Sequence, residues 1–130
     1  MGGREVTLID SSSWIDFLRG RQTEPALRVQ HLLAAGEDAW CDLIAVELWN
    51  GVRVGKERKA LDELEIELSS FPLDGEVWAL ARKLAFRCRQ SGITAPSNDI
   101  VIAACVVTHN LGLEHCDKHF DDILPLAKSL

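Results

Sequence analysis

The feature that most constrains the fold is a short apolar run near the N-terminus that ends in a carboxylate and three hydroxyls. Residues 6–10 read Val-Thr-Leu-Ile-Asp, and residues 11–13 are all serine. A short run of β-branched and apolar residues is typical of a buried strand, and serine is favoured at the start of a helix. The run therefore predicts a strand that turns directly into a helix. At that junction Asp10 either caps the helix or faces a ligand, because open α/β sheets bind ligands beyond the carboxyl ends of their strands.

The rest of the chain alternates between helix-like and strand-like segments. Helical spacing or capping signals occur in residues 14–18, 23–36, 42–52, 61–68, 76–91 and 97–110, and strand-like runs occur at 39–41, 71–73, 113–116 and 123–126. Two details stay open: Pro72 makes its run an edge strand or no strand, and residues 100–107, apolar on every side, favour a buried helix over a strand. The alternation predicts an α/β fold, with helices packed on a short parallel sheet, in one domain spanning residues 1–130.

Composition limits the classes of protein to which the chain can belong. Its 130 residues are 47% hydrophobic and 26% charged, which is enough for one packed core, and no uninterrupted apolar run approaches the ~20 residues of a membrane span. The four scattered cysteines form no C-x-x-C pair, so we expect a reducing, cytoplasmic location. A net charge of −6 argues against general adhesion to nucleic acid, but it permits a nuclease whose acids bind metal ions.

Four carboxylates occupy positions where a site could form. Asp10 and Asp117 follow predicted strands, and Glu47 and Asp99 lie in helical segments with apolar surroundings. A buried carboxylate costs several kcal/mol unless it is paired, protonated or bound to metal, which favours a functional role for Glu47 over a solvated helix position. For Asp99 the alternative is a structural role, in which its negative charge in the first turn interacts favourably with the helix dipole and stabilises the helix by ~0.3–1 kcal/mol. Clustered carboxylates are the ligands that Mg²⁺ and Mn²⁺ prefer and that metal-assisted phosphodiesterases use.

The order of these segments resembles a known family. The runs 8–18, 45–47, 98–104 and 117–120 look like those of the PIN-domain ribonucleases, and the most similar group is the VapC-type toxins of toxin–antitoxin pairs. The resemblance implies a PIN-like fold and a metal-dependent endoribonuclease. It also implies an RNA substrate, homodimers and a cognate antitoxin protein that docks across the active-site groove.

The same resemblance implies roles for individual residues. Mg²⁺ or Mn²⁺ would be held by an acidic quartet, and a nearby hydroxyl would hydrogen-bond within the site: Asp10, Glu47, Asp99 and Asp117, with Ser12 in support. Asp121 and Asp122 compete with Asp117 for the fourth position. Asp16 in the first helix is either an outer group of the site or a surface residue.

Three other interpretations were weighed against this one. A haloacid-dehalogenase-type phosphotransferase would need a second Asp where Ser12 stands. A zinc site could use His115, Cys116 and His119, but their spacing matches no familiar zinc pattern. The remaining alternative is a catalytically idle α/β module that only binds a partner. For partner binding we expect the stripe of Leu61, Leu64 and Leu68 to form part of a dimer or antitoxin contact.

Overall fold

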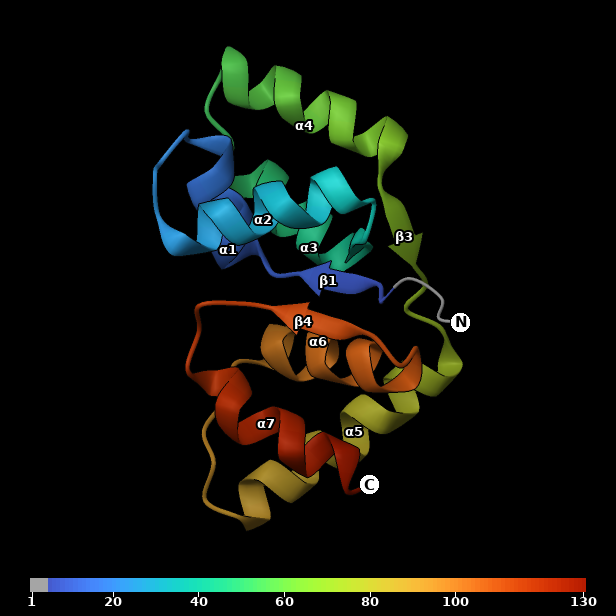
Figure 1. The fold of residues 1–130 in the computed structure, drawn as a ribbon. Helices are drawn as coiled ribbons and strands as arrows, with labels where there is room; N and C mark the ends of the chain where they lie inside the picture. The colour runs from blue at the N-terminus through green and yellow to red at the C-terminus, as the bar shows by residue number, and fades with distance from the viewer. Residues whose placement is uncertain (1–4) are drawn as a thin grey trace.

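A computed structural model of the protein describes residues 5–130, so the first four residues of the predicted domain lie outside the described residues. Four strands form one sheet: β1 (Thr7–Ile9), β2 (Asp38–Cys41), β3 (Ser69–Phe71) and β4 (Gly112–Glu114). Seven helices surround it in the described part of the chain: α1 (Ser11–Leu18), α2 (Glu24–Ala35), α3 (Asp42–Gly51), α4 (Lys56–Glu67), α5 (Gly75–Gln90), α6 (Ser97–Thr108) and α7 (His119–Lys128). The N-terminal helices α1–α4 and the C-terminal helices α5–α7 gather on opposite sides of β1 and β4 (Figure 1).

The sheet is parallel throughout, as the alternation predicted. Its strand order is β3-β2-β1-β4, and the central strand β1 pairs Leu8 with Ala39 of β2 and with Leu113 of β4. Leu8 and Ile9 are fully buried, which is expected where helices cover both faces of a parallel sheet. β3 lies at an edge and ends just before Pro72, a position where the missing amide of proline breaks no ladder.

Helix boundaries follow local capping chemistry. The carboxylate of Asp10 accepts a hydrogen bond from the amide of Ser12 and so caps α1, and the hydroxyl of Thr23 caps α2 as expected. Gly36 ends α2 in the left-handed conformation, with φ of 69°, where a side chain would be strained. The predicted ranges 42–52 and 97–110 took Asp42 and Ser97 as helix caps, which was wrong by one residue. The extended residues Cys41 and Pro96 precede α3 and α6, so Asp42 and Ser97 are already the first helical residues.

The C-terminal segment differs from its predicted form. Residues 123–126 belong to α7 and are not a strand. The physical reason is a helical period in the buried side chains, since Phe120, Ile123 and Ala127 lie three and four residues apart and all face the core. A four-residue window around Pro125 was too short to reveal that period.

The expected partner surface on α4 was also wrong. Leu61, Leu64 and Leu68 are buried within the chain and belong to its own hydrophobic core. The helix begins at Lys56, five residues before the predicted helical range 61–68. The exposed apolar side chains of this region are Val54 and Ile66, at 89% and 85% exposure.

The core centres on α6, which packs against α5 and α7. Its residues from Ile102 to Val106 are all buried, so the run that was apolar on every side is a central helix and not a strand. No helix within residues 5–130 is long and apolar enough to cross a membrane.

Candidate metal centre

The four predicted acids come from four different parts of the fold. Asp10 lies between β1 and α1, Glu47 lies on α3, Asp99 lies in the first turn of α6, and Asp117 lies in the loop between β4 and α7. Because β1 and β4 are parallel neighbours, their carboxyl ends meet at one edge of the sheet. A hydrogen bond of 3.2 Å from the side-chain Nδ2 of Asn98 to Glu47 Oε2 joins α6 to α3. The topology therefore brings the acids to one end of the sheet.

Asp10 is buried and held in place by Ser12. Asp10 Oδ2 accepts hydrogen bonds from the amide and the hydroxyl of Ser12, at 3.3 and 2.7 Å. The Ser12 hydroxyl in turn accepts a bond of 3.4 Å from the amide of Cys116, which lies beyond β4. Ser12 thus connects the β1–α1 junction to the loop that carries Asp117. Asp10 caps α1 and also lies at the carboxyl end of β1, so both interpretations of this residue hold at the same position.

Glu47 has one carboxylate oxygen without a protein partner. Oε2 accepts the bond from Asn98, but Oε1 is buried and has no hydrogen-bond partner among residues 5–130. Burial raises the pKa of Glu47, and the charge of Asp10 adds to this rise, whereas the side chains of Asn98 and Ser11 oppose it. An unpaired buried carboxylate oxygen is costly, and a cation would satisfy it. The donor set at this position fits a metal ion.

A second group of donors lies where α6 meets the start of α7. Asp99, Asp117 and His119 each offer one ligand atom, and these atoms lie within 4.8 Å of one another. His119 Nδ1 is 3.2 Å from Asp99 Oδ2 and 3.0 Å from Asp117 Oδ1. The amide of His119 also donates to Asp117 Oδ1 at 2.9 Å, which fixes this carboxylate at the start of α7.

The electrostatics of this group show an excess of negative charge. Burial, together with the charges of Asp117 and Asp10, raises the pKa of Asp99 to about 6, although the contact with His119 opposes this rise. Burial acts in the same direction on Asp117, but the amide and the charge of His119 hold the pKa of Asp117 below its usual value. Because Asp10 influences the pKa of both Glu47 and Asp99, the four acids form one electrostatic unit. Such a unit favours either a proton on Asp99 or a bound cation.

The competing acids occupy other surroundings. Asp121 is 73% exposed and lies 4.0 Å from His115 Nε2, and Asp122 is exposed on α7. Asp16 accepts hydrogen bonds from Arg21 and Thr23, so it ties the α1–α2 loop together. Neither Asp121 nor Asp122 belongs to the group that the described residues form with Asp99.

Sequence reasoning missed three polar residues of this region. Asn98 and His119 each lie next to or near a predicted acid, but a side-chain contact across separate elements leaves no signal in a single sequence. His119 was considered only with His115 and Cys116 as a zinc set, whereas the ring of His115 packs on Phe120 at 5.0 Å. Glu114, at the end of β4, accepts bonds from Ser13 and Arg28 and so anchors α1 and α2 to the sheet.

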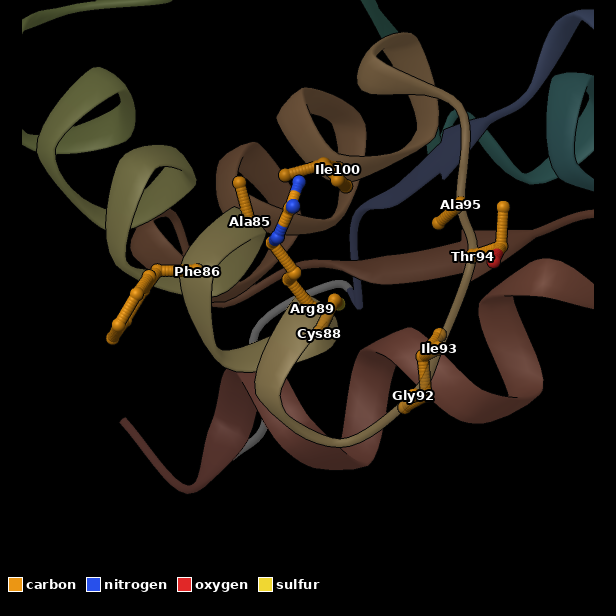
Figure 2. A pocket seen from close by; sticks show the side chains of 9 residues that line it. All are labelled: Ala85, Phe86, Cys88, Arg89, Gly92, Ile93, Thr94, Ala95 and Ile100. Atoms are coloured by element: carbon orange, nitrogen blue, oxygen red, sulfur yellow. The ribbon is translucent and has the colours of Figure 1, made fainter.

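A separate cavity of about 520 Å³ lies between the end of α5 and the start of α6 (Figure 2). Its lining is mainly apolar and includes no acid: Ala85, Phe86, Cys88, Arg89, Gly92, Ile93, Thr94, Ala95 and Ile100. Arg89 extends toward Ile100, and the ring of Phe86 points away from the cavity. This cavity lacks the donors that metal chemistry requires.

Comparison with known proteins agrees with this arrangement. A PIN domain family model matches residues 7–123. The VapC ribonuclease Mb1587 of Mycobacterium bovis is 32% identical over 122 residues, which cover 91% of each chain. The crystal structure of VapBC2 from Rickettsia felis, bound to a DNA fragment from its promoter, superposes with a TM-score of 0.76 at 17% identity over 93% of this chain and 94% of that one. VapBC-5 of Mycobacterium tuberculosis, a member of the VapBC family of toxin–antitoxin systems, gives 0.68 at 19% identity over 92% and 90%. The chain therefore belongs to the PIN domain family and, within it, to the VapC ribonucleases.

Proposed function

We propose that this protein is a Mg²⁺- or Mn²⁺-dependent endoribonuclease that acts as the toxin of a toxin–antitoxin pair. In this proposal the metal is held by Asp10, Glu47, Asp99 and Asp117, and Ser12 supports Asp10. The observation that carries the proposal is the buried, unpartnered Oε1 of Glu47, whose carboxylate interacts with Asp10, which in turn acts on Asp99. A cation would satisfy that oxygen and would offset the repulsion between Asp99 and the neighbouring carboxylates.

The side chains of the site would divide the work of phosphodiester hydrolysis. A bound divalent ion would lower the pKa of a water molecule and neutralise the charge that builds on the phosphate. Ser12 holds Asp10 through Oδ2, and Asn98 holds Glu47 through Oε2, so both carboxylates have fixed orientations. Water would attack phosphorus directly, so the RNA 2′-hydroxyl would take no part in the chemistry. The products would carry a 5′-phosphate and a 3′-hydroxyl.

The proposal extends to partners and location. The relatives are ribonucleases by name, and similar folds occur in structures of toxin–antitoxin systems, so we propose an RNA substrate, a cognate antitoxin and a homodimer for this chain. We also propose that residues 1–130 act as one domain in the cytoplasm. The exposed side chains Val46, Val54 and Ile66 replace the buried leucines of α4 as the apolar groups available to a partner on that side.

The test is cleavage of RNA by the purified chain, with the product ends mapped. We expect cleavage with Mn²⁺ or Mg²⁺, none in EDTA, and unchanged cleavage chemistry when a single 2′-deoxy nucleotide is placed at the cut. Asp10→Asn should abolish cleavage, whereas Asp62→Asn, at an exposed acid of α4, should leave it unchanged. Cyclic-phosphate ends or activity that survives chelation would overturn the proposal. A folded chain without metal-dependent cleavage would favour the idle binding module.

A further inference from the structure

A nitrogen atom, Nδ1 of His119, lies between two carboxylates of the proposed metal centre. We infer that His119 is itself a metal ligand, through Nδ1, and that it makes the site prefer Mn²⁺ over Mg²⁺. The inference rests on the proposed function, because it assumes that Asp99 and Asp117 bind a divalent ion. It adds a ligand and a metal preference that the acidic quartet does not contain.

The distances around His119 match those of neighbouring ligands on one ion. Nδ1 lies 3.2 Å from Asp99 Oδ2 and 3.0 Å from Asp117 Oδ1. Adjacent ligands of an octahedral ion with bonds of about 2.1–2.2 Å are separated by about 3 Å. All three donor atoms lie within 4.8 Å of one another, so one ion could bind all of them. The same distances suit a hydrogen-bonded ion pair, and the experiment must separate the two arrangements.

The backbone holds His119 in this position. It is the first residue of α7, and its amide donates to Asp117 Oδ1 at 2.9 Å. The next residue, Phe120, is fully buried and anchors the start of the helix in the core. Nδ1 faces the two carboxylates, while the side chain as a whole is 46% exposed. The imidazole therefore has a fixed inner nitrogen and an outer edge that solvent can reach.

The ligand type determines the metal preference. Mg²⁺ takes oxygen ligands and usually keeps several waters, whereas Mn²⁺ is the first member of the transition-metal series whose affinity for nitrogen-containing sites rises from Mn²⁺ to Cu²⁺. A purely carboxylate site would discriminate little between Mg²⁺ and Mn²⁺. Replacement of one carboxylate or water by imidazole should therefore strengthen Mn²⁺ binding more than Mg²⁺ binding.

The experiment measures metal binding directly on the full chain, with no RNA present. Electron paramagnetic resonance counts free Mn²⁺ during a titration, and competition with Mg²⁺ gives the ratio of the two dissociation constants. Electron spin echo modulation detects a coordinated imidazole nitrogen on bound Mn²⁺. We expect that modulation in the native chain and in His31→Gln, a matched control at an exposed histidine of α2. In His119→Gln we expect the modulation to disappear and the preference for Mn²⁺ over Mg²⁺ to fall at least fivefold.

The outcomes separate this inference from the proposed function. One outcome would overturn the role of His119 and leave the acidic site intact. In that outcome Mn²⁺ binds to the native chain without nitrogen modulation, and the binding is lost in Asp99→Asn. An unchanged metal preference in a folded His119→Gln would do the same. A native chain that binds neither ion would overturn both. The spin-echo measurement on the native chain does not depend on whether a variant folds.

Discussion

The first turn of α6 borders two different regions of the molecule, the candidate metal centre and an apolar cavity. Asn98 and Asp99 contribute to the acidic metal centre, whereas Ile100, the next residue, lines the cavity beside Arg89. The metal centre concentrates like charges, and the raised pKa of Asp99 shows that this arrangement opposes ionisation. The cavity concentrates apolar atoms, which stabilise the fold wherever they leave water. The chemistry of the donors therefore distinguishes the proposed metal centre from an apolar cavity, which lacks carboxylate ligands.

The largest effect should follow from removing charge at the metal centre. Asp99→Asn keeps the size of the side chain but removes a ligand for a hard cation, so RNA cleavage should fall by at least about 100-fold. Steady-state cleavage in Mn²⁺ measures this, with circular dichroism to confirm the fold. The neighbouring Ile100→Val should cleave at a rate close to that of the native chain. Equal loss in both variants would break the distinction between the two regions.

Metal should stabilise the native chain through the acidic region alone. An ion that binds only the folded state, present at a concentration of about 100 times its dissociation constant, adds about 2.7 kcal/mol to the free energy of unfolding. The melting temperature then rises by several degrees. Asp99→Asn should lose most of this shift, and Phe86→Ala, at an exposed ring beside the cavity, should retain it. A thermal melt with and without Mn²⁺ measures the effect. A metal-dependent shift that persists in Asp99→Asn would place the binding site elsewhere.

The cavity should affect stability without affecting chemistry. Ile93 is half-buried against the core and lines the cavity, so Ile93→Ala should destabilise the fold by about 1–2 kcal/mol. Cleavage at a temperature well below the melting point should not change. Urea unfolding of Ile93→Ala and Phe86→Ala provides the comparison, with the exposed ring expected to contribute little. A cleavage defect in Ile93→Ala would give the cavity a functional role.

The smallest effect concerns the pH dependence of stability without metal. In the folded chain the pKa of Asp99 is about 6, above its usual value of 3.8, so the folded state binds more protons than the unfolded state between these values. The contribution of Asp99 to stability should therefore decrease as pH rises from about 4 to 6 and remain lower above 6. Asp99→Asn removes this loss, and in EDTA at pH 7.5 it should be more stable than the native chain by on the order of 1 kcal/mol. The two chains should converge near pH 4, and melting curves across this range would reveal a different sign.

The sequence by itself determined most of the local elements and predicted which acids form the site. The short run that ends at Asp10 predicted β1 and the start of α1, and Thr23 and Gly36 marked the ends of α2, because capping and strand propensity act within a few residues. The alternation of elements predicted the parallel sheet. By contrast, the short window around Pro125 concealed the period of α7, and the apolar stripe of α4 did not reveal whether it packs inward or faces a partner.

Only the tertiary structure decided how the acids differ from one another. The unpartnered oxygen of Glu47, the raised pKa of Asp99 and the position of His119 between two carboxylates all depend on segments that are far apart in the chain. Side-chain direction across such segments is set by the packing of α3, α6 and α7 around the sheet, and no local pattern encodes it. Burial and neighbouring charge act over a few ångströms in space, whereas periodicity and capping act over a few residues in sequence.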